Sequence, residues 1–272
     1  MKKLLLTVAF VALGTGAALA QDTVRMGTEG AYPPYNMIND AGEVDGFERE
    51  LGDELCARVK VECTWVTNDW DSIIPNLVSS NYDTIMAGMN INEERKQVIQ
   101  FTQPYTPATP SAYVALSADA DVTGGVVAAQ TSTIQSSHVA ESGATLLEYA
   151  TPDETIAAVR NGEADAVMAD KDFLAPIVDE SGGELVWVDG YDTVPLGEGI
   201  GMGLRQSDTE LRDKFDAAIT AMKEDGSLNM LIQKWFGEDA MTFGAAEAAD
   251  ASAEPASAPS EGEAAEAEPA LN

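Results

Sequence analysis

The chain is poor in the residues that most enzymes and nucleic-acid-binding proteins need. Its 272 residues include one histidine, two cysteines and 15 basic residues against 46 acidic ones, for a net charge of -31. Such a chain has little with which to neutralise phosphates, which argues against binding to nucleic acid or to anionic lipid. The lone His138 leaves little material for histidine-based acid–base catalysis, a zinc centre or a Cys–His nucleophile. We therefore expect no enzyme, no metal and no cofactor.

Long apolar runs are also scarce, and the one present lies near the start of the chain. Two lysines precede an apolar stretch at residues 4–13, and small residues follow it up to Ala20. This order is typical of a secretory signal peptide at residues 1–20, cleaved before Gln21. A transmembrane anchor is the alternative, but the apolar stretch is shorter than the ~20 residues that a span needs. The mature chain is expected to be exported.

The two cysteines, Cys56 and Cys63, lie close together in the sequence, between the end of a predicted helix and the next predicted strand. In an exported protein such a pair is most simply a disulfide. A metal-binding pair is the weaker alternative because His138 is remote.

The composition changes again near the other end of the chain. Residues 244–272 are almost entirely Ala, Glu, Ser, Pro and Gly, with no aromatic or basic residue. We predict that residues 238–272 form a disordered acidic tail, a solubilising or spacer segment to which no site is assigned.

Between these ends, short apolar runs alternate with helical periods. The spacing of Phe47, Leu51 and Leu55 predicts a helix, and Thr151 followed by Pro152 is typical of a helix start. Strands are predicted at residues 24–27, 63–67, 84–86, 126–128, 166–168 and 200–204. The alternation predicts parallel βαβ units and an α/β fold.

Two connector-like stretches indicate a discontinuous, two-lobed architecture. One is rich in Pro and Thr (residues 103–110), the other is rich in Gly (residues 197–203), and each adjoins a predicted strand. If the chain crosses between lobes at both, the two crossings form a hinge. The predicted boundaries are lobe 1 at residues 22–109 plus 199–237 and lobe 2 at residues 110–198.

Candidate binding residues follow the predicted strands, where ligands of such sheets bind. Asn92 is a predicted N-cap that places Arg95 in the first turn of a helix, where a cation is unfavourable unless an anion binds there too. The alternative is a surface arginine paired with Glu93 or Glu94. Ser132 and Thr133 lie at a second helix start that suits the same anion, or they are simply caps.

The remaining candidates could hold the rest of a ligand. Asp170 ends a strand and is either a partner for an ammonium group or a helix cap. Glu29 either grips a polar or cationic side chain or is an exposed loop residue. Tyr32 and Trp70 could sandwich a ligand stem, although lone aromatics are more often core residues. An anion site and a cation-binding carboxylate together complement a zwitterion, which predicts hinge closure around a free amino acid.

These residues fall within longer motifs that resemble a known family. From about residue 23 to residue 236 the chain resembles the periplasmic solute-binding proteins of ABC transporters for polar amino acids, most closely the lysine/arginine/ornithine- and histidine-binding type. The resemblance is carried by GTEGAYPPY at 27–35, GFEREL at 46–51, WDSIIP at 70–75, YDTIMAGMNI at 82–91 with Arg95, GMGLR at 201–205 and DGS at 225–227.

The resemblance implies a type II periplasmic-binding-protein fold and a role for each site residue. Arg95 would hold the ligand α-carboxylate with the amides of Asn90 and Thr133. Asp170 would hold the α-ammonium with the Gly88 carbonyl and the Asn90 side chain. The remaining implied contacts are the aromatic walls Tyr32 and Trp70, Glu29 at the distal side-chain group, Ala87 near the side-chain pocket, and a disulfide between Cys56 and Cys63.

The resemblance further implies a monomeric periplasmic receptor that passes a free L-amino acid to an inner-membrane ABC permease. A basic ligand such as arginine, lysine, ornithine or histidine is favoured. However, Asn90 stands where a Ser or Thr is usual, Ala87 replaces a hydroxyl, and Ile134 stands where a glutamine may sit, which leaves an opine or another polar amino acid open. Two further functions stay open: a periplasmic dehydratase of prephenate or arogenate, with Glu29 or Asp170 as general acid, and the sensing domain of a receptor.

Overall fold

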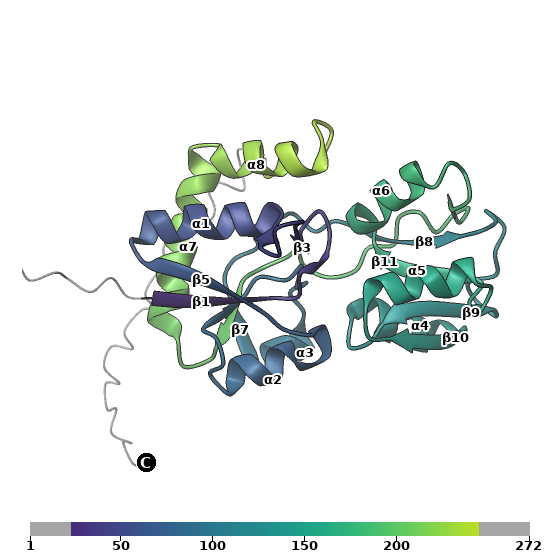
Figure 1. Ribbon diagram of the computed structural model, residues 1–272, viewed down its shortest axis with the longest axis horizontal. Helices are drawn as coiled ribbons and strands as arrows, with labels where there is room; N and C mark the ends of the chain where they lie inside the picture. Colours follow the sequence, from purple (N-terminus) through teal and green to yellow (C-terminus); the bar gives the residue numbers. More distant parts are fainter. Residues whose placement is uncertain (1–22, 245–272) are drawn as a thin grey trace, which may run out of the picture.

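The computed structural model describes residues 23–244, which form two mixed α/β bodies lying side by side (Figure 1). We call the body that contains the first strand lobe 1 and the other lobe 2. The predicted signal peptide and the part of the predicted tail beyond residue 244 lie outside the described residues. No helix within residues 23–244 combines the length and the apolarity needed to cross a bilayer.

Lobe 1 is built on a five-stranded sheet of order β5-β1-β6-β13-β7. Its strands are β1 (Thr23–Thr28), β5 (Glu62–Thr67), β6 (Thr84–Ile85), β7 (Ile99–Phe101) and β13 (Gly203–Arg205). β1 is parallel to β5 and β6, as predicted, whereas β13 is antiparallel to β6 and β7. The prediction of parallel units is wrong for β13 because this strand enters the sheet on the chain's return from lobe 2, not through a crossover helix.

Lobe 2 has a second five-stranded sheet of order β10-β9-β11-β8-β12. Its strands are β8 (Ser111–Ala115), β9 (Val126–Gln130), β10 (Thr145–Tyr149), β11 (Ala166–Asp170) and β12 (Val186–Trp187). β9 is parallel to β10 and β11, and β8 is antiparallel to β11 and β12. The two sheets thus draw their strands from different parts of the chain, and the predicted lobe boundaries at residues 109/110 and 198/199 stay a prediction.

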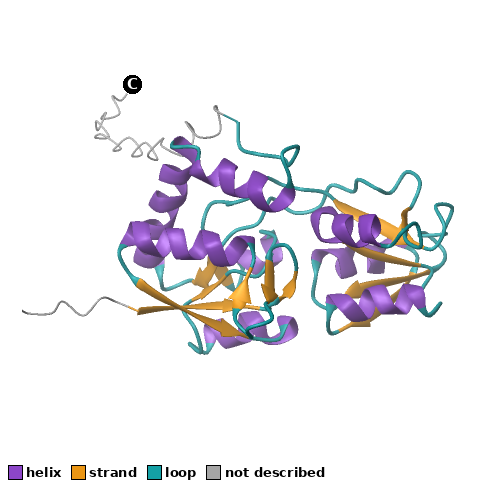
Figure 2. Ribbon diagram, turned by 45° about the horizontal axis from the view of Figure 1, so that its top comes forward, coloured by secondary structure: helices purple, strands orange, loops and turns teal. Residues whose placement is uncertain are grey.

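Helices cover both sheets (Figure 2). In lobe 1 they are α1 (Phe47–Val59), η1 (Trp70–Ser72), α2 (Ile73–Val78), α3 (Glu93–Lys96), α7 (Thr209–Glu224) and α8 (Ser227–Phe236). In lobe 2 they are α4 (Ile134–Ser142), α5 (Pro152–Arg160) and α6 (Lys171–Glu180). The predicted helical periods are confirmed: Phe47, Leu51 and Leu55 of α1 are fully buried, and Thr151 caps α5 in a capping box.

A small antiparallel sheet closes the site-facing end of lobe 1. It contains β2 (Ala31–Tyr32), β3 (Asn36–Ile38) and β4 (Val44–Asp45). The chain reaches α1 through Gly46, whose φ of 117° lies in the region that favours glycine and whose added Cβ would meet the Tyr35 carbonyl oxygen at 2.6 Å. The first helical amides are satisfied by the backbone: Phe47 donates to the Pro34 carbonyl and Glu48 to the Tyr35 carbonyl.

The chain passes between the lobes twice, and the two passages lie side by side. Thr106 and Ile200 form an antiparallel bridge, and the Tyr105 amide donates to the Ile200 carbonyl at 2.8 Å. Both connector-like stretches of the sequence therefore belong to one two-stranded hinge.

The segment after α8 differs from the prediction of a disordered tail from residue 238. Phe243 is only 8% exposed, its carbonyl accepts from Asn229 Nδ2 at 2.9 Å, and Lys223 Nζ lies 3.8 Å from its ring centroid. The assignment of residues 238–244 to the tail is corrected, because this aromatic side chain anchors them on lobe 1.

The predicted disulfide joins α1 to β5. Cys56 and Cys63 are bonded, with their Cα atoms 6.2 Å apart. Both sulfurs are therefore consumed, which removes the alternative of a metal-binding pair.

Candidate functional site

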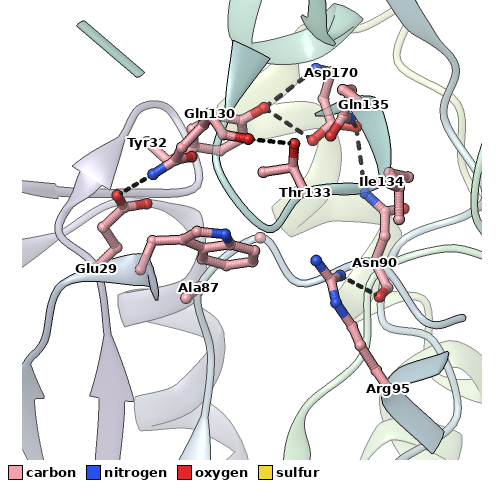
Figure 3. A pocket seen from close by; sticks show the side chains of 12 residues that line it. Glu29, Tyr32, Ala87, Asn90, Arg95, Gln130, Thr133, Ile134, Gln135 and Asp170 are labelled. Carbon is pink, nitrogen blue, oxygen red and sulfur yellow. Dashed lines mark hydrogen bonds between the residues drawn. The ribbon is translucent and has the colours of Figure 1, made fainter. Parts of the chain in front are cut away.

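A pocket lies where the two lobes face each other (Figure 3). The predicted site residues that line it are Glu29, Tyr32, Trp70, Ala87, Gly88, Asn90, Arg95, Thr133 and Asp170. Three further residues line it, Gln130, Ile134 and Gln135. Across residues 23–244 no group of three or more His, Cys, Asp or Glu side chains could hold a metal ion.

Arg95 is a buried cation whose protein partners are neutral. Asn92 caps α3 by accepting from the Arg95 amide at 2.8 Å, as predicted, and the side chain is only 8% exposed. The guanidinium donates to the backbone carbonyls of Asn90 (2.7 Å) and, across the lobes, Ser132 (3.2 Å). Among the described residues Arg95 makes no salt bridge, and burial lowers its pKa to about 10. The alternative of a surface arginine paired with Glu93 or Glu94 is wrong, since Arg95 is buried and forms a salt bridge with neither, and Glu93 pairs with Lys96.

Asp170 is the matching buried anion from lobe 2, and it is 5% exposed. It stands at the N-cap position of α6, yet its side chain makes no capping bond, so the cap alternative is wrong. Its carboxylate accepts from Tyr32 Oη (2.9 Å), Gln135 Nε2 (2.9 Å) and Asn90 Nδ2 (3.3 Å). These donors are neutral, and burial raises the pKa of Asp170 to about 6.

Glu29 follows β1 and reaches toward lobe 2 instead of standing free in a loop. Its Oε1 accepts from Gln130 Nε2 at 2.6 Å, a contact seen at the left of Figure 3. Burial raises the pKa of Glu29 to about 7, and the hydrogen bond from Gln130 opposes that shift. The pocket therefore holds a second carboxyl group, separate from Asp170, whose hydrogen-bond partner is the neutral Gln130.

Two buried aromatic side chains contribute to the pocket wall. Tyr32 is 8% exposed and stacks on Phe173 of lobe 2, with ring centroids 4.3 Å apart. Trp70 is 7% exposed, and the Arg95 guanidinium lies 5.2 Å from its ring centroid. Both rings are largely buried, and both also face the pocket.

The start of α4 only partly matches the prediction. Thr133 lines the pocket, and its hydroxyl and amide take part in the capping box with Ser136. Ser132 has an exposed side chain and a φ of 58°, and it is not among the pocket-lining residues. The backbone turns its carbonyl, and not its hydroxyl, toward Arg95. Ser132 thus contributes its backbone carbonyl to the surroundings of Arg95, and its part in ligand binding stays a prediction.

Three pocket residues, Gln130, Ile134 and Gln135, lie outside the predicted set of ligand-binding residues. Gln130 ends β9, and Gln135 lies on α4, where its Nε2 bonds both Asp170 and Ser111. Gln130 directly precedes the Thr-Ser-Thr run and is the strand-end position that the rule for sheet edges would have included.

Both lobes thus contribute to one polar pocket, with hydrogen bonds across it from one lobe to the other. The fold and this pocket define a two-lobed binding protein of the periplasmic-binding-protein type II fold. The chain belongs to the bacterial extracellular solute-binding proteins, family 3, whose family model matches residues 24–238.

Similar proteins agree with this assignment. The chain is 34% identical to the histidine-binding periplasmic protein of Escherichia coli K12 and 32% identical to the L-arginine-binding protein of Pseudomonas aeruginosa PAO1, in each case over 88% of this chain and 98% of the relative. A crystal structure of a periplasmic His/Glu/Gln/Arg/opine family-binding protein from Silicibacter pomeroyi in complex with lysine is 73% identical, with a TM-score of 0.79. That match covers 81% of this chain and all of that one.

Proposed function

We propose that this chain is the substrate-binding component of an ABC importer and that it binds a polar L-amino acid, preferably a basic one, between its lobes. The observation that carries the proposal is the pair of buried charges in one pocket: Arg95 from lobe 1 and Asp170 from lobe 2, each held by neutral groups. Arg95 and Asp170 attract each other across the pocket, but neither forms a salt bridge within the described residues. A buried charge without a direct ion-pair partner is costly, and a zwitterionic ligand supplies a carboxylate for Arg95 and an ammonium for Asp170.

The roles follow from charge. Arg95 binds the ligand α-carboxylate through its guanidinium, which matches a planar carboxylate. Asp170 binds the α-ammonium, with the Gly88 carbonyl and the Asn90 side chain as further partners. Asn90 already bonds Asp170 and accepts from Arg95, so it lies between the two charged groups.

Glu29 favours a basic side chain. Its carboxylate lies in the same pocket and has a neutral partner, Gln130, so a ligand ammonium or guanidinium would supply its counter-charge. The aromatic walls Tyr32 and Trp70 would flank the ligand's aliphatic stem. The lysine complex and the arginine- and histidine-binding relatives support this preference.

Ligand capture is proposed to work by hinge closure. In the structure the lobes are joined across the pocket by bonds from Tyr32 to Asp170, from Gln130 to Glu29 and from Arg95 to the Ser132 carbonyl. A ligand that links the same groups would stabilise this closed arrangement, and the two-stranded hinge permits opening. We further propose a monomeric periplasmic protein that delivers its ligand to an inner-membrane permease and catalyses no reaction.

The test is ligand binding to unfolded and refolded protein, which removes carried-over ligand. Thermal unfolding is measured with the common amino acids, ornithine, citrulline and simple opines. A ligand at 100 times its Kd should add ~2.7 kcal/mol and raise Tm by a few degrees. A shift with a basic amino acid supports the proposal, and a shift confined to opines or neutral amino acids discards the basic preference. Formation of an aromatic product from prephenate or arogenate would favour the dehydratase.

A charge deletion then tests the site. Arg95→Ala should weaken binding of the identified amino acid by about 3 kcal/mol or more, roughly 100-fold, because it leaves a carboxylate buried without its cation. Arg160→Ala, on the far side of lobe 2 and paired with Glu184, is the control and should bind normally. Calorimetry that finds wild-type affinity in Arg95→Ala would refute the assignment.

A further inference from the structure

One fully buried carboxylate lies outside the pocket and has no role in the site described above. Glu48 belongs to α1 and is 0% exposed. Its Oε1 accepts from the Gly88 amide at 2.7 Å and from the Tyr105 hydroxyl, and its Oε2 accepts from Asn36 Nδ2 at 2.7 Å. Among the described residues Glu48 forms no salt bridge. Hydrogen bonds from three neutral donors satisfy its two oxygens.

The first of these bonds fixes the backbone that follows β6. Gly88 lines the pocket and has a φ of 61°, and a Cβ added there would meet Tyr32 Cδ1 at 3.2 Å. Because Glu48 accepts from the Gly88 amide, it fixes the Ala87–Gly88 peptide group, which directly precedes the Gly88 carbonyl that the proposed function assigns to the ligand ammonium.

The second bond reaches the loop that follows β1. Asn36 donates to Glu48 and, with its Oδ1, accepts from the Gly30 amide at 2.7 Å. Gly30 directly follows Glu29 and has a φ of 74°. The relay from Glu48 through Asn36 to Gly30 therefore restrains the loop that carries Glu29.

The third bond ties the same carboxylate to the hinge. Tyr105 donates to Glu48 from the first passage between the lobes, and its own amide bonds Ile200 in the second. One carboxylate thus links two of the pocket-lining segments of lobe 1, those of Gly88 and Glu29, to the hinge strands.

We propose that Glu48 is the positioning residue of the lobe-1 half of the binding site: it sets the Gly88 backbone directly and the Glu29 loop through Asn36. This inference rests on the proposed function for its ligand but not for its geometry. All three groups around Glu48 donate hydrogen bonds, so both of its side-chain oxygens must act as acceptors. A glutamine at this position would direct its NH₂ group at one of these donors, so at least one of the three hydrogen bonds would be lost.

The first experiment uses ligand-free protein and hydrogen exchange, so its outcome does not depend on what binds. Glu48→Gln should reduce protection of the Gly88 amide by about tenfold or more, because the acceptor of this buried hydrogen bond changes from a carboxyl oxygen to an amide oxygen or, in the other orientation, to an NH₂ group. Asn36→Ala should expose the Gly30 amide and leave the Gly88 amide protected. The matched control is Asp83→Asn, which removes a carboxylate paired with Arg25 and Arg205 ahead of β6 and should leave both amides protected.

The second experiment measures affinity for L-lysine and L-glutamine by calorimetry, beside the melting temperature of each variant. Glu48→Gln should weaken both ligands by about tenfold or more, since Gly88 faces the part that they share. Asn36→Ala should weaken the binding of lysine more than that of glutamine, because Asn36 holds the Gly30 amide next to Glu29. Asp83→Asn should lower the melting temperature and change neither affinity.

Two results would overturn the proposal. One is Glu48→Gln with Gly88 protection as in the wild type. The other is Glu48→Gln with a lowered melting temperature but both affinities within about twofold of wild type, which is the behaviour of a merely structural carboxylate. If the wild type binds no amino acid, the proposed function fails while the exchange data still decide the role of Glu48. If Glu48→Gln does not fold, Asn36→Ala decides the role of Glu48: the Gly30 amide should lose protection from exchange while the Gly88 amide keeps it.

Discussion

At the scale of single residues, the pocket separates a ligand's common part from its variable part. In the proposed function Arg95 and Asp170 bind the groups that every free amino acid carries, whereas Glu29 is a third ionisable group with a neutral partner, Gln130. Affinity and specificity should therefore respond to different substitutions. A cation bound by Glu29 gains a charge-assisted hydrogen bond, and a neutral amide bound there gains only an ordinary one.

Glu29→Gln tests this separation. The change keeps the size of the side chain and removes its charge, so lysine should bind about tenfold or more weakly, because its buried ammonium loses a counter-ion. Glutamine should change by less than about threefold, because a neutral hydrogen bond is worth little net free energy. The measurement is calorimetry with both ligands, and Glu210→Gln on the exposed surface is the control. Equal losses for the two ligands would contradict the role of Glu29.

At the scale of elements, Arg95, which we propose binds the ligand carboxylate, is carried by a helix of one turn. α3 spans only Glu93–Lys96, too short to be stable by itself, and the Asn92 cap at 2.8 Å from the Arg95 amide holds its start. The same kind of cap starts α5 in lobe 2, where Thr151 accepts from the Glu154 amide away from the pocket. The two caps form a matched pair for experiment.

Asn92→Ala and Thr151→Ala should each destabilise the protein by ~1 kcal/mol, the usual cost of losing an N-cap. Only Asn92→Ala should also weaken ligand binding, because the turn that it holds carries Arg95. Chemical denaturation gives the first quantity and calorimetry the second. A similar affinity in both variants would mean that Arg95 is positioned by its bonds to Asn90 and Ser132 alone.

The sequence predicts those features of the elements that depend on nearby residues. The buried face of α1, the caps at Asn92 and Thr151, and the strand-end positions of Glu29 and Asp170 each follow from a few consecutive positions. The features it does not predict depend on distant partners. β13 is antiparallel because of the return passage from lobe 2, and Phe243 is fixed by Asn229 of α8.

The same limit explains the errors in the predicted site. Gln135 reaches Asp170 from a neighbouring helix, and no local pattern marks it. Ser132 carries a hydroxyl in a suitable place in the sequence, but its left-handed backbone turns the carbonyl toward Arg95 and leaves the side chain exposed. The contact between Ser132 and Arg95 is therefore made by the backbone carbonyl and not by the hydroxyl.

At the scale of the whole molecule, closure of two lobes buries carboxylates that then prefer a proton. Burial raises the pKa of Asp170 to about 6 and that of Glu29 to about 7. A carboxyl whose pKa is raised by folding binds more protons in the folded than in the unfolded state. Its contribution to stability therefore falls as the pH rises from the unfolded value through the folded one. For these two groups that window extends from about pH 4 to pH 7.

A bound cation reverses the direction, because it stabilises the ionised carboxylates and lowers their pKa values. Lysine should therefore bind more tightly as the pH rises from 5 to 8 and should release protons when it binds near pH 6. It engages both carboxylates, whereas glutamine engages only Asp170 with its ammonium, so the lysine affinity should rise more steeply. The measurement is the rise in melting temperature caused by each ligand at pH 5, 6, 7 and 8, with Glu29→Gln beside the wild type. In Glu29→Gln the rise in melting temperature caused by lysine should depend on pH no more steeply than the rise caused by glutamine. A rise caused by lysine that does not depend on pH in the wild type would contradict the assignment of both carboxylates.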